Sequence, residues 1–209
     1  MLINLKLKTF LLTASLFCYG FLSVSAQMLT NDELFKQPVY TSLKKALESP
    51  EQVYRLKLKG RLKSDSIPDE IFKFVNLQEL TLNGNRLYKI NSRISELQYL
   101  VYLDLSRNKL VDLPEEICDL QFLRALIINR NLIYKLPENI GKLKNLMLID
   151  AWGNQFYELP QSISLLKDNL KMLDILQIPI KEEEYLEMKK MLPNTEILYS
   201  IVCPCVIDR

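Results

Sequence analysis

Leucine and isoleucine positions recur with a fixed spacing through most of this chain. Leu77, Leu100, Leu123 and Leu146 are 23 residues apart, and Leu170 follows after 24. Each of these leucines opens the pattern Leu-x-x-Leu-x-Leu or a close variant of it. The later apolar positions alternate with other residues, as a strand buried on one face requires. The chain is therefore predicted to consist of stacked strand-containing turns that share one continuous core.

Further positions of the repeat predict how each turn continues after its strand. An asparagine side chain can bond the backbone of neighbouring turns where the strand pairing ends, so stacked copies predict an asparagine ladder over the four central turns. A proline followed by acidic or polar residues suits the first turn of a helix. The asparagines are Asn85, Asn108, Asn131 and Asn154, and short helices are expected to begin at Pro114, Pro137 and Pro160.

This pattern resembles the leucine-rich repeat family, in the 23-residue class with a Leu-Pro pair that occurs in Ras-suppressor-like proteins. The resemblance covers residues 53–192. It implies an α/β fold, a right-handed solenoid of about six turns with a parallel sheet on the concave face and short helices on the convex face. The N-terminal end has no cysteine-rich cap, which favours the secreted bacterial type.

Both ends of the array are expected to be capped. We assign residues 27–52 to an N-terminal helical cap, with a helix over Tyr40–Glu48 that covers the first repeat. A second helix is expected over Glu182–Met191, followed by a strand over Ile197–Val202. Residues 193–209 form the C-terminal cap strand and tail in this interpretation.

The first 26 residues are predicted to be a secretory signal peptide. Lys6 and Lys8 precede an apolar run over residues 10–22, and Val24-Ser25-Ala26 suits a cleavage site before Gln27. The run is shorter than the roughly 20 residues that span a bilayer. The mature protein is therefore expected to have no membrane span and to be exported to the periplasm, the cell surface or the medium.

The composition argues against most catalytic and nucleotide-binding functions. The chain has no histidine, which rules out a Ser-His-Asp triad, a Cys-His pair and histidine-ligated metal sites. It has only 5 glycines and no phosphate-binding loop motif. With 27 basic and 25 acidic residues and no basic block, it lacks the charge typical of nucleic-acid binding. We therefore expect a protein that is not an enzyme and that holds no cofactor and no metal.

The positions of the cysteines predict one packed thiol and one labile disulfide in the tail. Cys118 occupies a repeat position that holds Ser95, Gly141 and Ser164 in other turns, so a small, packed and unreactive thiol is expected. Cys203 and Cys205 are separated by one proline. A disulfide within so close a pair would be strained and easily reduced, and we expect such a labile bond in an exported protein.

The residues between the core leucines are expected to point to the concave face. The first turn is basic there, with Arg55, Lys57 and Lys59, whereas later turns carry apolar side chains that should be exposed to solvent. Trp152 is the only tryptophan, and Trp, Tyr and Arg are favoured interface anchors. The alternative is that the C-terminal cap covers these residues. The predicted partner-binding residues are Tyr102, Asp104, Ile127, Arg130, Leu148, Asp150 and Trp152.

These features favour a monomer that binds a protein partner through its concave face. A structural envelope role, with self-association through the tail at Ile201 and Val202, is the first alternative. Glycan binding through Trp152 and Tyr102 is the second. A catalytic pair of Asp150 and Asp174 is disfavoured, because an open surface would not desolvate one acid and raise its pKa.

Overall fold

The chain forms one open, all-parallel sheet whose strands follow their order in the sequence. The computed structural model describes residues 28–60, 62, 64–156 and 158–201, so the predicted signal peptide and Cys203 and Cys205 lie outside the described residues. The sheet order is β1 to β8, so strands that are consecutive in the sequence are neighbours in the sheet. The strands are β1 (Val39–Tyr40), β2 (Arg55–Lys57), β3 (Glu79–Thr81), β4 (Tyr102–Asp104), β5 (Ala125–Ile127), β6 (Leu148–Asp150), β7 (Met172–Ile180) and β8 (Glu196–Ile201).

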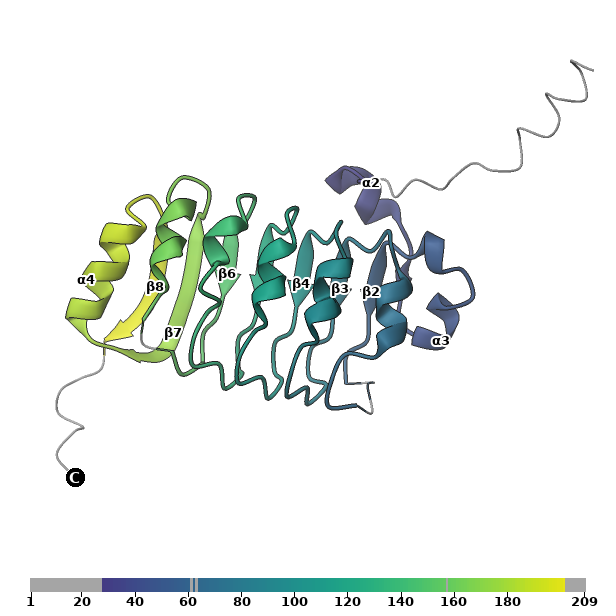
Figure 1. Cartoon of the computed structure of the whole chain (residues 1–209), viewed down its shortest axis with the longest axis horizontal. Helices are drawn as coiled ribbons and strands as arrows, with labels where there is room; N and C mark the ends of the chain where they lie inside the picture. The colour runs from purple at the N-terminus through teal and green to yellow at the C-terminus, as the bar shows by residue number, and fades with distance from the viewer. Residues whose placement is uncertain (1–27, 61, 63, 157, 202–209) are drawn as a thin grey trace, which may run out of the picture.

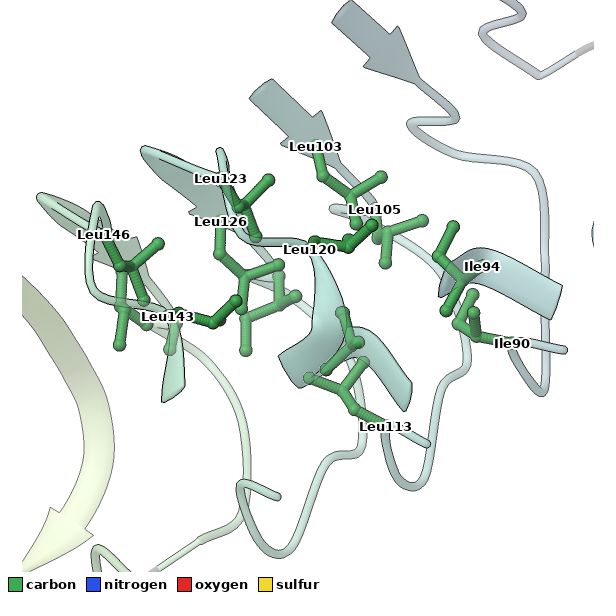
Figure 2. Close-up of a cluster of buried hydrophobic side chains, with 14 of the residues drawn as sticks. Ile90, Ile94, Leu103, Leu105, Leu113, Leu120, Leu123, Leu126, Leu143 and Leu146 are labelled. Atoms are coloured by element: carbon green, nitrogen blue, oxygen red, sulfur yellow. The ribbon is translucent and has the colours of Figure 1, made fainter. Parts of the chain in front are cut away.

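The turns from β2 to β7 each return through a short 3-10 helix, and Figure 1 shows the turns stacked side by side along the long axis. The side chains between strand and helix form the core. Figure 2 shows leucines and isoleucines of successive turns, such as Leu103, Leu126 and Leu143, packed in this layer. All three are fully buried. The helices are η1 (Pro50–Gln52), η2 (Asp69–Lys73), η3 (Ser92–Glu96), η4 (Glu115–Asp119), η5 (Ile140–Lys142) and η6 (Gln161–Leu166).

The helix expected to begin at Pro137 starts later. Pro114 and Pro160 immediately precede their helices, but η5 follows Asn139. The Glu115 carboxylate of the previous turn accepts hydrogen bonds from the backbone N–H groups of Glu138 (2.7 Å) and Asn139 (3.1 Å). The Glu115 carboxylate therefore caps these N–H groups. The Gly141 N–H donates to Ser162 Oγ (3.3 Å), which itself donates to the Glu138 carbonyl (2.6 Å). Ser162 thus replaces the backbone bond that would extend η5 back to Glu138, and residues 138–139 form a simple turn.

The asparagines join neighbouring turns as a buried ladder. Asn108 Oδ1 accepts hydrogen bonds from the backbone N–H groups of Asn85 (2.9 Å) and Leu87 (3.0 Å). Its Nδ2 donates to the carbonyl groups of Leu82 (3.0 Å) and Leu105 (2.8 Å). One amide therefore satisfies backbone groups of two turns at the place where strand pairing ends. Asn85, Asn131 and Asn154 bond the backbone in the same way.

The N-terminal cap differs from the single helix expected over Tyr40–Glu48. The helix α3 covers only Leu43–Ala46, and Tyr40 lies in β1, which pairs with β2. An uncovered β2 would present a row of unpaired backbone groups, and β1 pairs with them. A further helix, α2 (Asn31–Lys36), begins with a capping box between Thr30 and Glu33.

The C-terminal cap is a helix followed by a strand. The helix α4 spans Glu182–Met191, with acids in its first turn and lysines in its last, as the helix dipole favours. β8 then adds to the far side of β7. Thr195 closes the array, since its buried hydroxyl donates to the Leu170 carbonyl at 2.8 Å. Figure 1 shows α4 and β8 at the end opposite α2 and α3.

Gly141 allows two helical segments to approach closely. A Cβ at this position would lie 2.1 Å from the backbone oxygen of Ser162, so the backbone must move to accept one. We predict that Gly141→Ala lowers the free energy of unfolding by about 1–3 kcal/mol. Ser164→Ala, at the same repeat position one turn later, is the control because it loses only one exposed hydrogen bond. Equal urea unfolding curves for the two variants would contradict this packing.

Candidate open-face binding site

The strand register aligns outward-facing residues in columns. Leu103 pairs with Leu126 inside the core, so the residues on either side of each core position point away from it. We call this outer surface of the sheet the open face. One column holds Arg55, Glu79, Tyr102, Ala125, Leu148 and Met172, and the next holds Lys57, Thr81, Asp104, Ile127, Asp150 and Asp174.

The open face is partly apolar in its middle and later turns. Tyr102, Leu148 and Met172 are partly exposed, and Leu176 is 37% exposed. Ile127 was expected to be exposed, but only 9% of it is. It lies on the central strand β5 between the side chains of neighbouring strands about 4.8 Å away, which shield it. Ile127 therefore contributes little exposed area to the open face.

Trp152 is partly exposed on this face and pairs with one cation. The Arg130 guanidinium carbon lies 4.5 Å from the centre of the indole ring, a cation–π contact. Arg130 has a left-handed backbone with φ of 52°, as do Arg107 and Gln177 at the same repeat position. This position therefore turns the chain after each strand. The C-terminal cap extends the end of the sheet, and Trp152 keeps an intermediate exposure.

The half-buried carboxylate of Asp150 is only partly satisfied. Asn129 Nδ2 donates to Asp150 Oδ2 at 2.7 Å, whereas the buried Oδ1 has no partner among the described residues. Burial is the main cause that raises the pKa of Asp150. The nearby charges of Asp174 and Asp104 raise this pKa further, whereas Asn129 and the Trp152 backbone N–H lower it. Such a carboxylate opposes folding, which is typical of a residue kept for binding.

We predict that Asp150→Asn stabilises the protein at about pH 7 but not below about pH 3. The folded state holds the proton of this carboxyl more tightly than the unfolded chain does. Its ionisation therefore destabilises the fold as the pH rises above the unfolded pKa, and the amide removes that cost. Thermal melts at both pH values test this, with Asp112→Asn on the exposed loop as the control. A lower melting temperature of Asp150→Asn at neutral pH would contradict the prediction.

The basic first turn is largely paired within the fold. Arg55 forms an ion pair with Glu79, and Lys57 Nζ lies 3.4 Å from the same carboxylate. Arg55 also donates to the Phe35 carbonyl at 3.3 Å and lies over the Phe35 ring, which attaches α2 to the sheet. The three basic residues therefore do not form a free cationic patch, because Glu79 on the neighbouring strand neutralises part of it.

Buried polar atoms without partners gather on the open face. Among the described residues, Thr81 Oγ1, Asn83 Oδ1 and Asp150 Oδ1 are such atoms. Thr81 and Asp150 belong to the second column, Asn83 follows Thr81 by two residues, and Asn76 Oδ1 is the one other example among the described residues. Buried polar groups are normally hydrogen-bonded, so these atoms without partners cost stability in the free protein.

A pocket that the repeat pattern did not predict lies beside α2. It has a volume of about 310 Å³, and α2 forms one wall while β3, β4 and β5 form the other. Leu34 of α2 is buried at its base, and Phe35 is exposed beside it. The capping box at Thr30 could have revealed α2 in the sequence, but no local signal shows where the helix docks.

The described residues offer no candidate metal centre. They contain no group of three or more Cys, Asp, Glu or His side chains that could hold an ion. Asp150 and Asp174 are partners in the register of β6 and β7, yet they share an open surface with Asn129 and Trp152. Within the described part of the chain, no helix is long and apolar enough to cross a membrane.

Cys118 is a fully buried free thiol in the helical layer. Burial raises its pKa to about 12, and the charges of Glu115 and Asp119 act in the same direction. The reactive thiolate is therefore scarce at neutral pH. We predict that Cys118 in a Cys203→Ser/Cys205→Ser double variant of residues 27–209 resists a thiol reagent when folded and reacts fully in denaturant. Rapid labelling of the folded protein would contradict this.

Comparisons with known proteins agree with this architecture. A family model described as a leucine-rich repeat region matches residues 92–194. A leucine-rich repeat protein of Leptospira interrogans is 28% identical with a TM-score of 0.64, and the match covers 79% of this chain and 48% of that one. The plant peptide hormone receptor RGFR1, solved in complex with RGF2, is 31% identical with a TM-score of 0.57, over 69% of this chain and 24% of that one.

This chain therefore spans about half the length of the Leptospira protein and a quarter of the receptor. A search of curated proteins gave no significant match. The parallel sheet, the asparagine ladder and the family match support the same assignment. The chain has the fold of a leucine-rich repeat solenoid, and residues 92–194 are similar to a leucine-rich repeat region.

Proposed function

We propose that this protein is an exported, non-enzymatic binding protein that holds a protein partner against its open face, the concave side of the solenoid. The observation that carries the proposal is Trp152. It is a partly exposed indole two residues after the end of β6, with Arg130 over the ring and Asp150 nearby. Aromatic and arginine side chains within a polar rim are where binding energy concentrates at protein interfaces.

The comparison with solved structures also supports a protein partner. A plant peptide hormone receptor with a similar fold was solved in complex with RGF2.

The signal-like segment of residues 1–26 supports export, and it directs the search for a partner to surface and extracellular proteins. We expect residues 27–209, immobilised as bait in surface extracts, to retain one protein that mass spectrometry can identify.

Two arginine substitutions distinguish the faces. Leu148→Arg places a charge on the open face, and Leu165→Arg places the same charge on the helical layer, where Leu165 is 60% exposed. The proposal predicts that Leu148→Arg loses the captured protein and that Leu165→Arg keeps it. Loss with Leu165→Arg alone would assign binding to the opposite face.

A further inference from the structure

The pocket beside α2 is a preformed apolar recess at the N-terminal end of the open face. Its lining is mostly apolar, with Val101 and Tyr102 from the β4 region, Ala125 from β5, and Leu34 and Phe35 from α2. At about 310 Å³ it lies at the lower end of the range for ligand pockets. That size suits one large side chain better than an extended molecule.

The wall of the pocket that α2 provides is held firmly. Arg55 bonds the backbone of α2 at the carbonyls of Phe35 (3.3 Å) and Gln37 (3.5 Å), and Leu29 N–H donates to Gln78 Oε1 at 3.3 Å. Phe35 is nevertheless 71% exposed. An exposed aromatic ring beside an apolar recess is the kind of surface that a partner covers.

The charges around the pocket are not balanced. Glu79, the carboxylate in the wall, is already paired with Arg55 and Lys57. Arg124 lines the pocket as well, is exposed, and forms no ion pair with any residue that the structure describes. The unpaired charge at this apolar recess is therefore a cation, and it favours an occupant that carries a carboxylate.

We propose that the pocket receives a large apolar side chain of a partner peptide segment, and that an Asp or Glu near that side chain in the segment pairs with Arg124. Ala125 in the pocket belongs to the column that continues over Leu148 and Met172. The same segment therefore runs from α2 across the open face. This inference rests on the proposed function and adds the chemistry of the partner.

Peptides selected from a phage-displayed random linear library on residues 27–209 test this inference. The selected sequences should share a large apolar residue next to, or one residue away from, an acidic residue. Their affinities are then measured by fluorescence polarisation on three variants. Ala125→Phe fills the pocket without strain on the fold, because the neighbouring strands carry Tyr102 and Leu148 in the same column. Arg124→Glu reverses the charge, and Lys171→Glu makes the same change at the equivalent position two turns away.

We expect Ala125→Phe to weaken binding by about tenfold or more. Arg124→Glu should also weaken binding, and it should favour peptides in which lysine replaces the acidic residue. Lys171→Glu should have little effect. Unchanged affinity with Ala125→Phe, or equal effects of the two charge reversals, would overturn the inference. If Leu148→Arg still abolishes capture of the partner protein in that case, the open face keeps its proposed function and only the pocket is excluded. If it does not, both proposals fail.

Discussion

Replacing Asn131 by leucine should lower the free energy of unfolding by about 2 kcal/mol or more. Only 5% of Asn131 is exposed. Its Oδ1 accepts from the Leu110 N–H at 3.1 Å, and its Nδ2 donates to the carbonyls of Leu105 (3.1 Å) and Ile128 (2.8 Å). Leucine has the same number of side-chain heavy atoms in a similar branched shape, but it has no polar atoms. The buried Leu110 N–H is then left without a partner, at a cost of about 1–3 kcal/mol. The Leu105 and Ile128 carbonyls each lose one of two donors, because Asn108 and Asn154 also bond them.

The control for this prediction is Asn145→Leu on the surface. Asn145 is exposed and makes one hydrogen bond, from Nδ2 to the Gln121 carbonyl at 2.8 Å. It should lose less than about 1 kcal/mol, because water replaces the lost partner. Urea unfolding of both variants measures the difference. If the two curves moved equally, the ladder would not be a main source of stability.

Replacing Trp152 by alanine should weaken partner binding by about 2 kcal/mol or more, while the melting temperature changes little. The ring is partly exposed and rests against Arg130, so the free protein loses few contacts when it is removed. In a complex the ring would be buried, and burial of apolar surface contributes roughly 25 cal/mol per Å² before the costs of association.

Trp152→Phe is the matched variant, because it keeps an aromatic ring for Arg130 to cover. It should retain part of the affinity that Trp152→Ala loses. The competing interpretation, in which Trp152 serves the fold, requires a loss of about 3–5 kcal/mol in stability on truncation to alanine, as for a core tryptophan. A large stability loss with unchanged affinity would remove Trp152 from the site.

The repetitive part of the fold was predictable because local and long-range signals coincide in it. Leu103, Leu126 and Ile149 occupy the same repeat position, and the structure places them in register on adjacent strands. The asparagine position predicts a ladder because no other side chain of that size offers both donors and an acceptor. The columns of the open face follow from the same register.

The capping and surface details were not predictable, because tertiary contacts decide them. The spacing of Tyr40 from the apolar residues that follow it predicts a helix. In the structure Tyr40 lies in β1 instead, because β1 pairs with the otherwise unpaired edge of β2. The late start of η5 depends on Ser162, a residue 24 positions after Glu138 whose hydroxyl bonds both the Gly141 N–H and the Glu138 carbonyl. Likewise, the pocket requires α2 to dock on the sheet through Arg55, and no sequence pattern encodes that contact.

Site-specific photo-crosslinking tests most directly whether the partner lies on the open face. A photoreactive phenylalanine derivative is placed at Leu148 on the open face, or at Leu165 on the helical layer. Each protein, residues 27–209, is then illuminated with the captured partner. The proposal predicts a covalent complex from position 148 and none from position 165. A complex from position 165 alone would contradict binding through the open face.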